Sequence, residues 1–103
     1  MLDLLVIGAG LAGLSAALAA AEAGLRVRVI AKGMGALHWH AGTLDVLGYL
    51  PDDPLAVTSP FTAFDRLTEA HPYRLLGVET VRTALGRFQG WAGEELAYDG
   101  APD

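Results

Sequence analysis

Three glycines near the start of the chain have the spacing of a loop that binds phosphate groups. In the stretch "VIGAGLAG", Gly8, Gly10 and Gly13 form a G-x-G-x-x-G pattern. In such loops the first glycine permits a tight turn, the second lets the backbone approach a phosphate, and the third lets a helix pack closely on a strand. Free N–H groups at the start of that helix, together with its dipole, attract an anion. The pattern predicts nucleotide contacts from Gly8, Ala9, Gly10, Leu11, Ala12 and Gly13.

The sequence on either side of these glycines predicts a strand, a helix and a second strand. The apolar run Leu4–Ile7 fits a parallel strand that is covered on both faces. A helix is expected over Leu11–Ala23, with Gly24 just past its end in a left-handed conformation. Val27–Ile30 reads as a second parallel strand. The predicted fold class is α/β: the N-terminal βαβ of a Rossmann-like FAD/NAD(P)-binding domain over about residues 2–31, plus additional helices, in an incomplete domain.

The residue that follows the second predicted strand departs from the usual dinucleotide pattern. An acid about 20 residues beyond the glycines usually accepts hydrogen bonds from ribose hydroxyls. This chain instead has Ala31 and then Lys32. Three interpretations stay open: a dinucleotide held without the acid, a 2′-phosphate bound by Lys32 or Arg28, or a mononucleotide that has no second ribose. Ala31 and Lys32 are therefore included among the candidate cofactor-binding residues.

The histidines and Asp45 are the other side chains that could do chemistry. His38 and His40 flank Trp39 and would share one face of an extended segment, but no third ligand with suitable spacing follows. We therefore predict no metal site. His71 is expected at a helix C-terminus, where its charged form meets the dipole favourably. Asp45 is expected to be a turn or helix-start carboxylate, and no catalytic residue is nominated.

Composition limits the class of protein. The chain has 103 residues, of which 52% are hydrophobic and 18% charged, enough for one globular unit at most. A net charge of -5 does not indicate a nucleic-acid surface. Glycines interrupt the apolar stretch near the start, which argues against a signal peptide and against direct membrane insertion. The absence of cysteine excludes disulfides and iron–sulfur ligands in this segment and fits a cytosolic setting.

After the second strand the sequence predicts a loop and two more helices. The loop covers about residues 32–59. One helix over about 60–70 would begin after Ser59 as its N-cap, and another would cover about 78–89. Each helix has an apolar stripe that needs a partner surface. The stripes consist of Phe61, Phe64 and Leu67 and of Val81, Leu85 and Phe88. Leu96–Tyr98 would begin a further strand.

Two longer stretches carry a resemblance to a known family. They are "ALHWHAGTLDVLGYLP", Ala36–Pro51, and "AHPYRLLG", Ala70–Gly77. With the glycine motif, they make the chain resemble, nearly end to end, the N-terminal part of the B subunit of anaerobic glycerol-3-phosphate dehydrogenase, in the FAD/NAD(P)-binding Rossmann-type flavoprotein superfamily. Shorter matches lie between the glycine motif and the first of these stretches, at Gly24–Leu25–Arg26 and Lys32–Gly33, and the matches within that stretch include Gly42 with Leu44–Asp45.

The resemblance implies a flavoprotein subunit that works with a catalytic A subunit and a membrane-anchoring iron–sulfur C subunit. Such an enzyme oxidises glycerol 3-phosphate to dihydroxyacetone phosphate and passes electrons to the quinone pool. It would be cytoplasmic, or peripheral on the cytoplasmic face of the inner membrane through its partner subunits. FMN is the cofactor usually attributed to this subunit, whereas the glycine motif suits FAD. Family members often have a small residue where Ala31 stands, and Gly42 and Thr43 of the matching stretch join the candidate cofactor-binding residues.

The length of the chain bears on its expected activity. Subunits of this family are several times longer than 103 residues, so the sequence reads as a fragment that would be inactive alone. Two other function classes stay open. One is a truncated, non-catalytic nucleotide-binding or assembly module. The other is a fragment of another FAD/NAD(P)-dependent oxidoreductase, or a small NAD(P)-binding protein that uses Lys32 in place of the acid.

Overall fold

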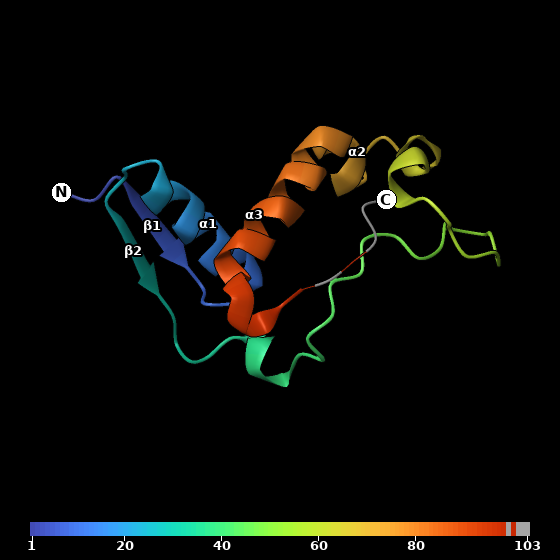
Figure 1. Cartoon of the computed structure of the whole chain (residues 1–103). Coiled ribbons are helices and arrows are strands. Elements are labelled where there is room, and N and C mark those ends of the chain that lie inside the picture. Colours follow the sequence, from blue (N-terminus) through green and yellow to red (C-terminus); the bar gives the residue numbers. More distant parts are fainter. Residues whose placement is uncertain (99, 101–103) are drawn as a thin grey trace. The chain divides into compact units, whose positions relative to one another are not determined.

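The chain folds into two compact units, Met1–Thr43 and Leu44–Asp103 (Figure 1). The computed structural model describes residues 1–98 and 100. The single unit expected from composition is therefore corrected to two, and each is described by itself. The elements in chain order are the strand β1 (Leu4–Ile7), the helix α1 (Leu11–Glu22), the strand β2 (Val27–Ile30), the 3₁₀ turns η1 (Ala36–Trp39), η2 (Pro60–Thr62) and η3 (Phe64–Arg66), and the helices α2 (Pro72–Leu76) and α3 (Val78–Leu96).

The first unit is a βαβ element around a two-stranded parallel sheet. β1 and β2 pair in parallel with Leu4 opposite Val27 and Ile7 opposite Ile30. The crossover between them is α1, which lies along the strands in Figure 1. This arrangement confirms the predicted α/β class with a Rossmann-like βαβ start.

The end of α1 follows the predicted glycine geometry. Gly24 has a φ of +81°, in the left-handed region. Its N–H donates to the carbonyl of Ala21, and the N–H of Leu25 donates to the carbonyl of Ala20. This pair of bonds is the Schellman motif, which satisfies carbonyls that the helix leaves free at its C-terminus. The turn sends the chain directly back into β2.

The sheet of the first unit is covered on one face, not on two as its apolar sequence suggested. Val6 is 8% exposed, whereas Leu5 is 50% and Ile7 80% exposed. Successive strand residues point to opposite faces, so α1 covers the face of Val6 and leaves the face of Leu5 and Ile7 open. The unbroken apolar run predicted a strand that is buried on both faces of the sheet. In the first unit, α1 covers only one of these faces.

An exposed ion pair ties the beginnings of the two strands together. The backbone N–H, Nε and Nη2 of Arg26 each donate to the carboxylate of Asp3 over 2.9 Å. The hydrogen bond from the Arg26 side chain, followed by that from its backbone, lowers the pKa of the Asp3 carboxyl below 3.8. The backbone N–H groups of Asp3 and Leu4 also donate to the Arg26 carbonyl. These contacts hold β1 and β2 in register from one end.

We predict that Asp3→Asn lowers the melting temperature slightly at neutral pH and not at all at low pH. A carboxyl whose folded-state pKa is lowered stabilises the fold above its unfolded pKa and loses that contribution as the pH falls through the folded value. The effect is small and weakened by salt, because the Asp3 and Arg26 side chains are 34% and 60% exposed. Thermal unfolding followed by circular dichroism at two pH values measures it. Asp45→Asn is the control, since Asp45 makes no ion pair within the described part of the chain. A difference between wild type and Asp3→Asn that persists at low pH would contradict this assignment.

The second unit departs from the predicted helices. The helix expected over 60–70 is instead the two 3₁₀ turns η2 and η3, and η3 ends where Leu67 becomes extended. The side chain of Ser59 makes no capping hydrogen bond. Leu67 is extended, with φ -80° and ψ 160°, so no helix continues across it. His71 is extended as well, with ψ 136°, as expected of the residue before a proline. The short helix α2 that follows was not predicted.

The last helix is longer than predicted. α3 was expected to end near residue 89, but it continues to Leu96 across a kink at Gly93, where φ is +65°. Leu96 therefore lies in a helix, and Ala97 next to it is left-handed with φ 37°. Leu96–Tyr98 thus begins no strand, and this prediction was wrong. Of the final "DGAPD", Asp99 and residues 101–103 lie outside the described residues.

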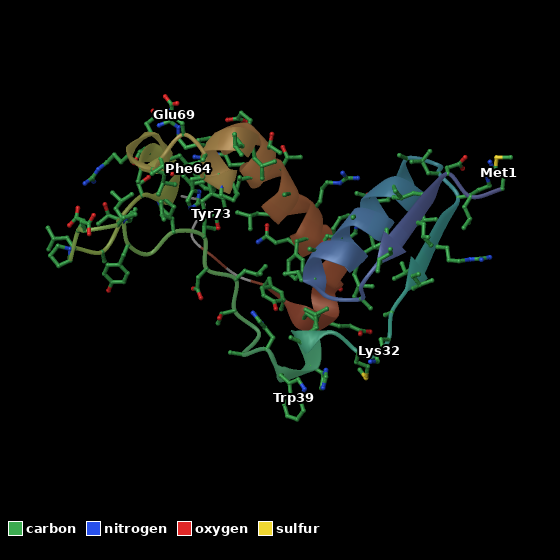
Figure 2. The ribbon with its side chains drawn as sticks, turned by 180° about the vertical axis from the view of Figure 1, so that it is seen from behind. Met1, Lys32, Trp39, Phe64, Glu69 and Tyr73 are labelled. Atoms are coloured by element: carbon green, nitrogen blue, oxygen red, sulfur yellow. The ribbon has the colours of Figure 1, made fainter. Side chains whose placement is uncertain are left out.

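The apolar stripes of the second unit pack on one another. Phe64 is 3% exposed, and its ring stacks on that of Tyr73 with centroids 4.9 Å apart. Both residues are labelled in Figure 2. The buried cluster consists of Leu50, Ala63, Phe64, Leu67 and Val81. The stripes were expected to need an outside partner surface. Most of these side chains instead pack together within residues 44–98, with Leu50 of the loop among them, whereas the ring of Phe88 contacts that of Tyr98.

The segment predicted as a loop over 32–59 carries some local structure. It contains η1 and an isolated antiparallel bridge between Tyr49 and Ala56.

None of the helices in the described ranges 1–98 and 100 has the length and apolarity needed to cross a membrane.

Candidate functional site

Gly8 turns the chain out of β1. It has a φ of +111°, and its N–H donates to the carbonyl of Ile30 over 2.8 Å, one step beyond the paired strands. A β-carbon built there would meet no atom of the described residues within 4 Å, chain neighbours apart. The need for glycine at position 8 is therefore conformational, since other residues rarely adopt this φ.

Gly10 is the N-cap of α1 and needs no glycine for the sake of the fold. Its backbone is extended, with φ -82° and ψ -178°, a conformation open to any residue. Apart from its chain neighbours, no atom of the described residues 1–98 and 100 lies within 4 Å of a β-carbon built at position 10. Neither the backbone conformation nor the packing therefore requires glycine at position 10. The remaining physical reason for glycine is a ligand that approaches the backbone, the role of the second glycine in nucleotide loops.

Gly13 is needed for packing. A β-carbon at position 13 would collide with the backbone carbonyl oxygen of Gly8 and lie 3.3 Å from Cγ1 of Val6. The first turn of α1 therefore rests directly on the end of β1. This is the close helix–strand contact that the third glycine of such loops permits. Glycine is thus favoured at positions 8, 10 and 13 for three different physical reasons.

The first turn of α1 offers backbone donors to an anion. The first intrahelical bond is that from the Leu14 N–H to the Gly10 carbonyl, at 3.0 Å. The N–H groups of Leu11, Ala12 and Gly13 precede it and have no partner inside the helix. No side chain caps the helix and no acidic residue lies in its first turn. The open space at Gly10 and these donors together fit a phosphate group.

The end of β2 lies beside the glycine loop. Ile30 pairs with Ile7, and so Ala31 follows β2 at the same edge of the sheet at which Gly8 follows β1. Ala31 and Lys32 are both exposed, and Lys32 is labelled in Figure 2. Arg28 lies further back, opposite Leu5. The three interpretations of the missing acid stay open on this geometry.

Gly35 is a residue near the site that was not among the predicted contacts. It is the only partly buried residue between Ala31 and Thr43, a stretch that the structure describes throughout and whose other residues are all exposed. Its backbone rests on the peptide that joins Ala9 to Gly10. The stretch "KGMG" offers two glycines with nothing in the sequence to distinguish them, so only the folded contact identifies Gly35.

Gly42 and Thr43 lie at the end of the first unit. Gly42 has a φ of +84°, and its N–H donates to Nδ1 of His40 over 3.1 Å. This hydrogen bond is local, and Thr43 is exposed. The contact of Gly42 and Thr43 with a cofactor stays a prediction.

The histidines take other positions than expected. His38 lies in the 3₁₀ turn η1 and His40 is its C-cap, so the two do not share the face of an extended segment. His71 is the N-cap of α2, where Nδ1 accepts a hydrogen bond from the N–H of Tyr73. The expected C-terminal role of His71 was wrong, because Pro72 starts a helix directly after it. Within residues 1–98 and 100, no cluster of three or more His, Asp or Glu side chains could hold a metal ion.

The first unit has the geometry of an α/β nucleotide-binding protein. A parallel βαβ carries a glycine loop at the carboxyl end of β1, and the helix that follows directs free N–H groups to the same place. In doubly wound folds, ligands bind at this end of the strands.

Comparison with known proteins gives the family. The model of the FAD-binding domain family matches residues 3–103. The chain therefore belongs to the FAD-binding domain family, a class of flavin-binding proteins.

Several relatives share a name, that of the B subunit of anaerobic glycerol-3-phosphate dehydrogenase. The relative from Halobacterium salinarum, where the name is qualified as probable, is 47% identical over 90 residues, which cover 87% of this chain and 21% of the relative. The relative from Aliivibrio fischeri strain MJ11 is 42% identical over 103 residues, covering 97% and 22%. That from Vibrio cholerae El Tor Inaba N16961 is 47% identical over 90 residues, covering 84% and 20%. These relatives confirm the resemblance seen in the sequence.

The chain spans about a fifth of the length of these relatives. No solved structure matches it.

Proposed function

We propose that this chain binds FAD through its glycine loop and forms the flavin-binding part of a subunit of an anaerobic glycerol-3-phosphate dehydrogenase. The observation that carries the proposal is Gly10, a glycine that the fold itself does not require, at the N-cap of a helix with free donors. The family match and the relatives named as B subunits of that enzyme support the choice of ligand and enzyme.

The residues of the loop would divide the work of holding the nucleotide. The N–H groups of Leu11 and Ala12 would donate to phosphate oxygens, with Gly10 giving room for close approach. Gly8 and Gly13 would fix the loop and the helix that position these donors. Lys32 would add positive charge at the carboxyl end of β2, within reach of a negatively charged nucleotide. Gly42 and Thr43 belong to the proposed site through the family resemblance alone.

The glycine loop and the family name support the proposal of FAD as the bound flavin. A loop of this type is suited to the pyrophosphate of a dinucleotide, and the family model is named for FAD. A single phosphate can occupy the same helix N-terminus, so FMN is the alternative that the experiments must separate. When bound, the flavin supplies the electron transfer, and the protein supplies binding and orientation.

The proposed complete enzyme oxidises glycerol 3-phosphate to dihydroxyacetone phosphate and passes the electrons to the quinone pool. It works with a catalytic A subunit and an iron–sulfur C subunit that anchors the complex, and it stays at the cytoplasmic face of the membrane. The lettered subunit name that the relatives share supports a complex of several subunits. Because no residue of this chain is assigned to catalysis, the chain alone is expected to hold flavin without oxidising glycerol 3-phosphate.

Direct analysis of the bound cofactor tests the proposal. The purified protein is reconstituted with FAD, FMN or NADP⁺ in parallel, and unbound ligand is removed. Visible absorbance shows whether flavin is retained, and mass spectrometry of the released molecule identifies it. Retained FAD is the expected result. Retention of NADP⁺ with no flavin would favour a pyridine-nucleotide protein that uses Lys32, and retention of none of the three would refute the proposal.

A substitution at position 31 separates the two flavins. Ala31→Glu restores the acid that usually accepts ribose hydrogen bonds. We expect the substitution to lower the dissociation constant for FAD by about tenfold, which corresponds to one hydrogen bond to a charged group. The dissociation constant for FMN should stay unchanged. Dissociation constants from flavin fluorescence titrations measure both. Ala31→Leu, which adds bulk without an acceptor, is the control. An Ala31→Glu variant that binds FAD as the wild type does would contradict the placement of a second ribose beside Ala31.

A further inference from the structure

The turn after β2 touches the glycine loop at Gly35. A β-carbon built on Gly35 would lie 2.6 Å from the carbonyl oxygen of Ala9, 2.7 Å from Cα of Gly10 and 2.9 Å from the carbonyl carbon of Ala9. All three are backbone atoms, which cannot move aside as the end of a flexible side chain can. The backbone of Gly35 therefore supports the peptide between Ala9 and Gly10 from one side.

Glycine is needed at position 35 because there is no room for a side chain. Gly35 has φ -67° and ψ 179°, a conformation that any residue adopts. A β-carbon built on Gly33, two residues earlier, has no atom of residues 1–98 or 100 within 4 Å, chain neighbours apart. Of the two glycines in this short segment, only Gly35 lies where a β-carbon would meet the backbone of the glycine loop.

His38 holds Gly35 in place. Its Nδ1 donates to the Gly35 carbonyl over 2.9 Å, and Gly35 is the N-cap of the turn η1 that carries His38. The carbonyl that accepts this bond belongs to the residue that contacts Ala9 and Gly10. The imidazole therefore fixes the segment at its point of contact with the loop.

We propose that Gly35, held by His38, is a positioning residue for the phosphate-binding loop. This inference rests on the proposed function, because it assigns a role to Gly35 only if Gly10 is where a nucleotide phosphate approaches. The hydrogen bonds from the first turn of α1 to a phosphate depend on where the Ala9–Gly10 peptide lies. A side chain at position 35 pushes that peptide and thereby weakens nucleotide binding without itself touching the ligand.

Matched alanine substitutions test the contact. Gly35→Ala is expected to raise the dissociation constant for FAD at least about tenfold, the value of one hydrogen bond to a charged group. Gly33→Ala is expected to leave it unchanged. Titrations are done well below the melting temperature of each ligand-free variant, measured by circular dichroism. A Gly35→Ala variant that melts earlier yet binds FAD like the wild type would show a merely structural role and overturn the inference.

A second pair of variants keeps the inference testable if Gly35→Ala does not fold. His38 is exposed, so its substitution disturbs no core. His38→Leu removes the donor and is expected to weaken FAD binding by about threefold, as for one neutral hydrogen bond. His38→Asn, whose amide can donate from a similar position, is expected to restore it. Equal binding by His38→Leu and the wild type would overturn the role of His38. Failure of the wild type itself to bind flavin would instead refute the proposed function.

Discussion

Gly10→Val is expected to purify with little or no flavin while folding like the wild type. The variant keeps the fold because position 10 has an extended backbone and, chain neighbours apart, no atom of the part that the structure describes lies within 4 Å of a β-carbon. Valine favours extended conformations. The added side chain would instead fill the space into which the proposed phosphate approaches the N-terminus of α1.

The expected loss follows from the hydrogen bonds at that helix end. Moving the phosphate outward breaks at least one charge-assisted bond to a backbone N–H, which is worth ~1.5–3 kcal/mol. That corresponds to a dissociation constant about ten- to hundredfold higher. Gly10→Ala, with a single methyl group, is expected to lie between wild type and valine.

Flavin occupancy of the purified variants, from absorbance, measures the effect, and the melting temperature of ligand-free protein checks the fold. Gly48→Val is the matched control, since Gly48 also has open space around it but lies in the second unit. Full occupancy in Gly10→Val would rule out the phosphate site at this loop. A lower melting temperature of the ligand-free variant would show that the fold does depend on Gly10.

The βαβ unit could be predicted from the sequence because its signals are local. An apolar run, three spaced glycines, an alanine-rich helix and a glycine at its end fall within the first 30 residues, and each constrains its own backbone. The positive φ values of Gly8 and Gly24 agree with this prediction. The same residues define the candidate phosphate site, which is why the site could be proposed before the fold was known.

The second unit was predicted less well because distant contacts shape it. An apolar stripe at Phe61, Phe64 and Leu67 suggested one amphipathic helix. The chain instead forms two 3₁₀ turns whose side chains face Leu50 and Val81. Packing of that kind overrides a local pattern that two conformations can satisfy. The role of Gly35 at the site could not be predicted for the same reason, because it depends on a contact with Ala9 and Gly10, far from it along the chain.

Gly13→Ala is expected to destabilise the first unit, although alanine normally favours a helix over glycine. In an unobstructed helix this change stabilises by about 0.5–1 kcal/mol. At position 13 the new methyl group meets the backbone oxygen of Gly8 and approaches Cγ1 of Val6. Val6 is the buried residue of β1, so neither neighbour can retreat without separating α1 from the strand.

The helix preference of alanine and the cost of overpacking together determine the expected loss of stability in Gly13→Ala. Overpacking of this kind typically costs about 1–3 kcal/mol, and a backbone obstacle places the cost at the upper end. A net loss of about 2 kcal/mol would lower the melting temperature by roughly 10 °C for a domain of this size. Because the displaced oxygen belongs to the glycine loop, flavin affinity should fall as well.

Gly86→Ala is expected to change the stability of the same protein in the opposite direction. Gly86 lies in α3 with no positive φ, and among the described residues no atom outside the helix backbone comes within 4 Å of a β-carbon built there. Here the helix preference acts alone, and the variant should melt at a slightly higher temperature than the wild type with flavin binding unchanged. Circular dichroism melts of the two variants therefore separate helix preference from packing. If Gly13→Ala is as stable as Gly86→Ala, α1 does not rest on the end of β1, and the positioning of its N–H groups toward a phosphate loses its structural basis.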